Sequence, residues 1–334
     1  MLDAAPSEFA PARRSGHPLL RYALRRTSAG VVLLVVVSIL VFAATNLLPG
    51  NVATAVLGRN ATPQAVAQMD RRLGLDRPLA TQYVSWLSGI AHGDLGTSLA
   101  ANQPVSSMIG DPAYNTLVLA CVTVLLLIPT SLVFGVIAGV RGGRPADKVI
   151  SAGAIGFSSV PEFVIGTALI LTFGVAWSIL PPVSLVAPGA DPLASPSLLV
   201  LPVATLLVAG TGYMVRMIRA GMLDVMGSPY VEMGRLTGVR ELRVVVRHAL
   251  PNALAPAVQA FALTLQWLIG GVVVIETLFG YPGIGQALVQ AVIVRDMPLI
   301  QAIVMLIATV YIATNIVADL LVIVLVPKLR TSLP

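Results

Sequence analysis

Three carboxylates, Glu162, Glu276 and Asp319, interrupt long runs of apolar residues. An ionisable group inside a bilayer is costly, so such residues mark a solute path or pair with other groups inside a helix bundle. Glu162 could meet the ammonium group or a cationic side chain of a cargo, or it could hydrogen-bond within the bundle. Glu276 could face the mouth of a path or brace the Phe279–Gly285 turn, and we expect bracing. Asp319 is expected to pair with a loop arginine.

No enzymatic constellation accompanies these carboxylates. His17, His92 and His248 lie far apart in the sequence, and Cys121 is the single cysteine, so no pair has metal-ligand spacing. The phosphate-binding pattern G-x-x-x-x-G-K-[ST] does not occur in the chain. The sequence therefore favours neither a membrane enzyme nor an ATPase, and energy from ATP would have to come from another chain.

Residues 216–254 are too polar to span a membrane and too patterned for a plain loop. Tyr230–Leu236 predicts a short helix that Gly238 ends, as glycine does at helix C-termini. Leu242–Ala249 predicts a second helix that ends before Pro251. Such a compact knob could dock into a cleft of a soluble partner. Alternatively, it could lie on the membrane surface without a partner.

The composition places the chain among membrane proteins. Apolar residues make up 56% of the chain and charged residues 11%, whereas a soluble domain carries about 25% charged residues. The net charge of +6 does not indicate nucleic-acid binding, because the basic residues stand between apolar segments as topogenic charges do.

Six segments are long and apolar enough to span a bilayer. The third is long and contains Pro161 and Glu162, so it could be tilted or broken. The predicted fold is an all-α membrane protein with about six transmembrane helices. The six spans are Ser28–Leu47, Asn115–Val140, Val149–Ile179, Pro196–Val215, Ala255–Thr277 and Leu299–Val326.

The first span could instead be a cleaved signal peptide, with Arg21, Arg25 and Arg26 as its basic flank. Its apolar run is longer than a usual signal core, so we expect a retained helix. Sixteen Lys and Arg residues fall in the N-terminal tail, the even loops and the C-terminal tail, and five fall on the other side. This asymmetry places both termini in the cytoplasm.

These spans divide the chain into a cytoplasmic tail (1–27), a first helix (28–47), an external subdomain (48–114), a transmembrane core (115–326) with the cytoplasmic loop 216–254, and a second cytoplasmic tail (327–334). Within the external subdomain, Thr62–Leu73 predicts a helix with Thr62 as N-cap. Thr81–Ile90 predicts an amphipathic helix near the membrane surface, where Tyr83 and Trp86 are favoured.

The cytoplasmic loop carries a family signature. Glu232-Met233-Gly234, three residues, Gly238, nine residues, His248, one residue and Leu250-Pro251 resemble the E-A-A, G, I, L-P motif of membrane subunits of binding-protein-dependent ABC importers. Met233, Gly234 and His248 depart from that motif. The resemblance implies a type I importer fold in which this loop is the coupling helix that sits on the ATPase subunit. It assigns the contact to Tyr230, Glu232, Gly234, Gly238, His248, Leu250 and Pro251.

The resemblance covers nearly the whole chain and is closest to the first permease of the dipeptide and oligopeptide branch. It is carried by Leu48-Pro49-Gly50, Leu73–Leu79, Gly93–Ser98, Glu276–Gly285 and Asp296-Met297-Pro298. The chain departs from the branch at Asn51, Glu162 and Val326, of which Glu162 stands beside Pro161 in the third span.

The resemblance implies import of short peptides across the bacterial inner membrane with four kinds of partner. These are a second homologous permease that forms a heterodimer, two ATPase domains, an external peptide-binding protein and the lipid bilayer. ATP and Mg would be held by the ATPases, and no cofactor or metal by this chain. The alternatives are a nickel or glutathione importer of the same branch, or an ion-coupled secondary transporter that needs no ATPase.

Overall fold

The computed structural model describes residues 18–47, 61–73 and 76–325, which contain helices and no β-strand. This confirms the all-α prediction. The α-helices are α1 (Pro18–Leu47), α3 (Pro63–Leu73), α4 (Leu79–Ala91), α5 (Val105–Val140), α6 (Pro145–Ser158), α7 (Glu162–Leu169), α8 (Ser197–Met226), α9 (Pro229–Leu236), α10 (Glu241–Arg243), α11 (Leu250–Phe279), α12 (Ile284–Val294) and α13 (Met297–Leu325). The described residues also contain two π-helical segments and one 3-10 turn. These are η2 (Ile170–Ala176), η4 (Val244–Ala249) and η3 (Pro192–Ala194).

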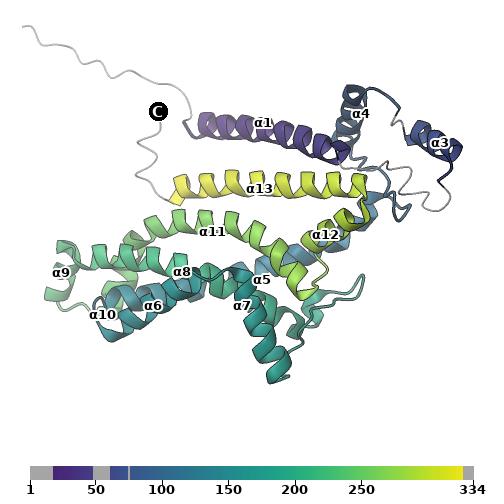
Figure 1. Cartoon of the computed structure of the whole chain (residues 1–334). Helices are drawn as coiled ribbons and strands as arrows, with labels where there is room; N and C mark the ends of the chain where they lie inside the picture. Colours follow the sequence, from purple (N-terminus) through teal and green to yellow (C-terminus); the bar gives the residue numbers. More distant parts are fainter. Residues whose placement is uncertain (1–17, 48–60, 74–75, 326–334) are drawn as a thin grey trace, which may run out of the picture.

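Five of these helices, α1, α5, α8, α11 and α13, contain stretches long and apolar enough to cross a bilayer, and a bent pair makes up to six spans. Figure 1 shows the start of α1, the end of α13, α9 and α10 at one end of the molecule, and α3, α4 and α12 at the other. The segments richest in Lys and Arg thus gather at one end. Asn51, Val326 and the tails 1–17 and 327–334 lie outside the described residues.

Several helices extend beyond the predicted apolar spans. Helix α1 begins at Pro18 rather than Ser28, so part of the predicted tail is helical. Helix α5 begins at Val105 rather than Asn115 because Val105 and Ile109 are buried against α12 and α13. Helix α8 runs to Met226, so the polar connection is shorter than residues 216–254. Apolar composition alone misses such ends, since helices continue wherever packing stabilises them.

The third predicted span is broken. Its two parts, Pro145–Ser158 and Glu162–Ala176, meet at an angle of 103°. Proline disfavours helical geometry in the residue before it, so Val160 and Pro161 end one helix and start the next. Glu162 is therefore the first residue of α7. The break that Pro161 and Glu162 suggest in the third span is confirmed.

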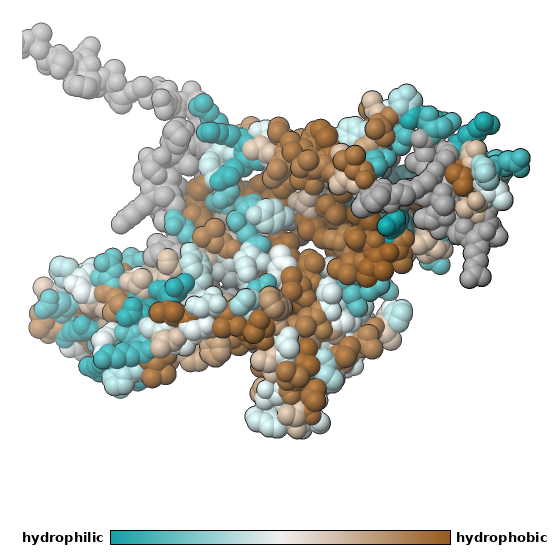
Figure 2. All heavy atoms as spheres, in the orientation of Figure 1, coloured by the Kyte–Doolittle hydropathy of each residue, from teal (hydrophilic) through white to brown (hydrophobic). Residues whose placement is uncertain are grey.

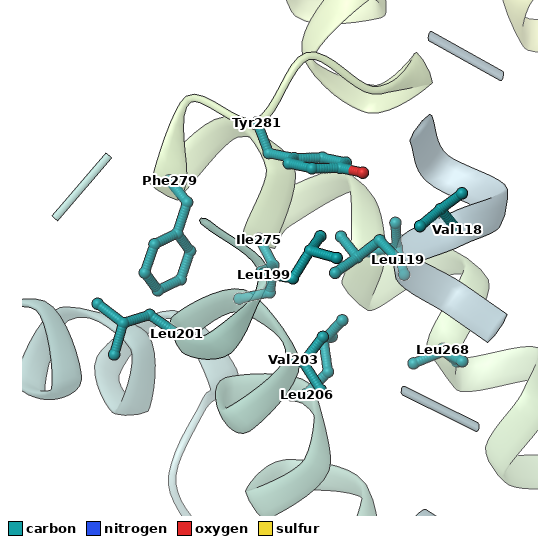
Figure 3. Close-up of a cluster of buried hydrophobic side chains, with 11 residues drawn as sticks. Val118, Leu119, Leu199, Leu201, Val203, Leu206, Leu268, Ile275, Phe279 and Tyr281 are labelled. Carbon is teal, nitrogen blue, oxygen red and sulfur yellow. The ribbon is translucent and has the colours of Figure 1, made fainter. Parts of the chain in front are cut away.

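The core lies between α5, α8 and α11. Leu119 from α5, Leu206 from α8, and Ile275 and Phe279 from α11 are all fully buried in one cluster, and Figure 3 shows these side chains converging. Towards the end that carries α9, a Cβ at Gly139 of α5 would collide with the Met222 side chain of α8. Small residues allow this close approach of helices inside a membrane.

Helix α1 is attached to the bundle through α13. Gln301 Nε2 donates to Thr45 Oγ1 at 2.7 Å, and Arg26 lies 3.0 Å from Asp319 near the other end. Ser38 and Tyr83 share a hydrogen bond of 2.8 Å that brings α4 alongside α1. Figure 2 shows hydrophobic residues across the middle of the molecule and hydrophilic ones towards its ends. This pattern suits contact with acyl chains or another apolar chain.

Candidate functional site

The connection from α8 to α11 forms a knob, defined here as residues 229–249. Pro229 starts α9, Thr237 and Gly238 end it, and α10 begins at Glu241. The expected second helix does not end before Pro251. It continues through η4 into α11, with Pro251 in the first turn. The wider i→i+5 turns of a π segment accommodate a proline that lacks an N–H donor.

Gly238 makes the turn at the tip of the knob. Its φ is +78°, a left-handed conformation that residues with a side chain rarely adopt. Its N–H donates to Arg235 O at 3.0 Å, and Val239 N–H donates to Gly234 O at 3.1 Å. This is the glycine-ended helix that the sequence predicts.

The inner face of the knob is part of the bundle core. Val231 and Val244 are fully buried and contact a cluster that includes Ile218 and Met222 of α8 and Ala253 of α11. Burying such side chains is worth about 1.5–3 kcal/mol each. The inner face of the knob is therefore packed against both α8 and α11.

The outer face of the knob exposes several large apolar side chains among charged ones. Leu236 and Leu242 are both 76% exposed, Met233 60%, Val246 54% and Tyr230 47%. Large apolar side chains grouped on one exposed element mark an interaction surface.

An ion pair connects the two helices of the knob, α9 and α10. Arg235 donates to both carboxylate oxygens of Glu241, at 2.7 and 3.1 Å. The guanidinium lowers the pKa of the Glu241 carboxyl from its usual value. The bidentate bond connects α9 to α10 across the Gly238 turn, and because both side chains are about half exposed its contribution to stability is small.

The seven residues predicted to contact an ATPase lie together on the knob and at the start of α11. Five of them, Tyr230, Glu232, Gly238, His248 and Pro251, are exposed, and Gly234 and Leu250 are half-buried. Leu250 packs against the buried cluster beneath the knob. The most exposed apolar side chains of the knob, Leu236 and Leu242, are not among the motif residues. Only their exposure in the fold distinguishes them.

The three candidate path carboxylates lie on three different helices, α7, α11 and α13, and share no bonding partner among the described residues. Glu162 is half-buried, and its carboxylate has no hydrogen bond or ion pair with the described residues. Asp319 is paired, but with Arg26 of α1 at 3.0 Å. The expectation of a loop arginine was wrong because α1 extends far enough to bring Arg26 beside α13.

Glu276 is fully buried and braces the turn between α11 and α12. Its carboxylate accepts the Thr116 hydroxyl of α5 at 2.5 Å and Gly285 N–H at 2.7 Å. A Cβ at Gly283 would collide with this carboxylate. In the same turn, the Tyr281 hydroxyl donates a hydrogen bond to Asn115 O at 2.8 Å. In this arrangement Glu276 is a structural residue of the turn and is closed off from solvent.

Sequence reasoning missed an ion pair between a half-buried arginine and a buried aspartate near the knob. Arg219 of α8 donates through Nε and Nη2 to Asp147 at the start of α6. In the sequence Arg219 counts among the topogenic charges of the loop 216–254, and Asp147 lies 72 positions before it. Among the residues that the structure describes, no group of three or more His, Cys, Asp or Glu residues could hold a metal ion.

The fold and its knob define a multi-pass, all-α membrane protein of the transporter class. Residues 131–331 match the family model of the binding-protein-dependent transport system inner membrane component, and residues 19–120 match the N-terminal region of such membrane components. The chain belongs to this family. It is a permease subunit of an ABC transport system, as the sequence resemblance predicts.

Named relatives cover nearly the full chain. A protein named as a candidate peptide transport system permease of Brucella abortus is 34% identical over 307 residues, which are 92% of this chain and 98% of the relative. A candidate peptide ABC transporter permease of Sinorhizobium fredii is 33% identical, with 92% and 99% covered. The glutathione transport system permease protein GsiC of Salmonella choleraesuis is 35% identical, with 93% and 99% covered.

Proposed function

We propose that this chain is one permease subunit of an ATP-driven importer of short peptides, and that its knob docks on an ATPase subunit. The observation that carries the docking is the exposure of Met233, Leu236 and Leu242 on an element whose inner face is packed into the bundle. The peptide cargo is supported by the names of relatives that match along almost all of their length.

The complex would contain a second homologous permease, two ATPase domains that bind ATP and Mg, and an external peptide-binding protein. The apolar surface of α1, where Val32 is 63% and Leu40 62% exposed, suits lipid or the second permease. Both termini and the knob would face the cytoplasm, in agreement with the excess of Lys and Arg at that end. The described part of residues 48–114 would face the binding protein.

In this mechanism the chain alternates between an inward-facing and an outward-facing packing. ATP closes the two ATPase domains, and the knob moves with the domain on which it sits. The helix bundle then changes its packing, because the closed ATPase binds one of the two packings more strongly than the other. The third span, broken at Val160 and Pro161, offers a place where such a change in packing can be absorbed.

Purification in mild detergent tests this function. We expect the tagged chain to bring down an ATPase subunit and a second permease. Replacing Leu236 and Leu242 together with Ser should remove the ATPase but leave the second permease. As a matched control, replacing Val32 and Leu40 of α1, which are also apolar and more than 60% exposed, with Ser should leave the ATPase bound. Transport of solute by the purified chain alone, without an ATPase, would contradict the proposal and favour a secondary transporter.

Glutathione is a second candidate cargo, because the GsiC relative is as similar as the peptide permeases. Competition of glutathione with a dipeptide for uptake by the whole complex separates the two. Uptake of nickel, measured in the same complex, tests the remaining alternative within this branch.

A further inference from the structure

The Asp147 carboxylate lies at the first turn of α6 and is only 2% exposed. Its oxygens accept Gly143 N–H at 2.8 Å, the Ser151 hydroxyl at 3.0 Å and Arg219 Nη2 at 2.8 Å, in addition to Arg219 Nε. A buried carboxylate with this many donors is held in one position. Arg219, bonded through both arms of its guanidinium, is held with it.

Arg219 stands where the knob joins the bundle. Its neighbours on α8, Ile218 and Met222, belong to the cluster that buries Val231 and Val244 of the knob. A movement of the knob therefore acts directly on the stretch of α8 that carries Arg219. The ion pair is a side-chain link between that stretch and α6.

A second contact holds α6 and α8 together about two helical turns further along both helices. There a Cβ at Gly212 of α8 would collide with Ala154 O and lie 2.9 Å from Ser158 Oγ of α6. Held at both points, α6 has to follow α8 as one body. Helix α6 then ends at Ser158, where the chain turns by 103° into α7 and Glu162.

We propose that the Arg219–Asp147 ion pair is the link through which movement of the knob reaches the broken third span, which makes both residues positioning residues for transport. The inference rests on the proposed function, since it needs an ATPase that moves the knob. Without the ion pair, ATP hydrolysis should continue. The angle between α6 and α7 at Val160 and Pro161 should then no longer change with it.

The alternative is a purely structural role, in which Asp147 caps α6 and the pair only stabilises the fold. Replacing Arg219 with Gln separates the two roles, because Gly143 N–H and Ser151 can still bond to Asp147. Arg216→Gln is the matched control. It removes an arginine one turn away on α8 that is exposed and makes no ion pair with the described residues.

The experiment uses the whole complex in proteoliposomes, with binding protein, both permeases, both ATPase domains and a dipeptide. ATP hydrolysis and dipeptide uptake are measured together with the yield of assembled complex. For R219Q and D147N we expect normal yield, hydrolysis within about twofold of wild type and uptake per ATP lowered about tenfold. R216Q should keep the wild-type ratio.

A single variant that fails to assemble does not end the test. The double variant D147N/R219Q leaves no unpaired buried charge, and R219K keeps the charge but loses the two-armed geometry. We expect lowered uptake per ATP in whichever of these assembles, and a wild-type ratio in either overturns the inference. If the wild-type complex itself takes up no dipeptide on ATP hydrolysis, the proposed function fails instead.

Discussion

Ser98 donates its hydroxyl to the carboxylate of Asp296, although 198 positions separate the two residues in the chain. Leu99 N–H donates to the other oxygen at 3.1 Å, and Asp296 is 1% exposed. The bond closes the turn before α5 against the start of α13. Two separate sequence motifs are therefore in contact in the fold: Gly93–Ser98 and Asp296-Met297-Pro298. We call this contact the clasp.

We predict that replacing Asp296 with Ala destabilises the protein by about 2 kcal/mol or more, because Ser98 Oγ and Leu99 N–H lose their acceptor in a buried site. The measurement is the temperature at which the purified chain loses its monodisperse profile in detergent. Asp224→Ala removes an exposed aspartate of α8 and should leave that temperature unchanged. Equal behaviour of the two variants would contradict a role for the clasp.

Gly283→Ala should destabilise the chain by about 1–3 kcal/mol, the usual range for overpacking. The new methyl group would collide with the Glu276 carboxylate, which is held by Thr116 and Gly285. Gly153→Ala adds the same methyl group on α6, where nothing lies within 4 Å, and should be neutral or slightly stabilising. The same thermal measurement compares them, and the prediction is wrong if G283A is as stable as G153A.

Gly238→Val should abolish ATP-driven uptake while the chain still inserts in the membrane. A Cβ at Gly238 meets no atom within 4 Å, so the effect comes from the left-handed φ of +78°, which a β-branched residue cannot adopt without strain. Gly189 has φ +72° and equally open surroundings, but lies far from the knob in sequence. Gly189→Val should keep most of the uptake, and full uptake by G238V would rule out docking through this turn.

The sequence predicts the helical class, the knob and its Gly238 turn because each depends on local pattern: apolar runs, a glycine and prolines. It does not predict that α5 starts at Val105, because that start is stabilised by burial against α12 and α13. Helix α12 itself was missed, since its 11 residues are too few for a span. The partners of Asp319 and Asp147 were missed for the same reason: ion pairs join residues that only the packing of helices brings together.

Glu162 carries the last prediction. It is half-buried at the start of α7, directly after the bend in the third span, and its carboxylate is unpaired among the described residues. An unpaired carboxylate at the junction of two apolar helices can be stabilised by a cationic side chain of a passing cargo. Glu162→Gln should therefore lower uptake of a lysine-containing dipeptide several-fold and leave that of dialanine unchanged, measured in the whole complex. Since Gln keeps the size and the polar end of the side chain, equal uptake of the lysine peptide by E162Q and wild type would show that the carboxylate does not meet the cargo.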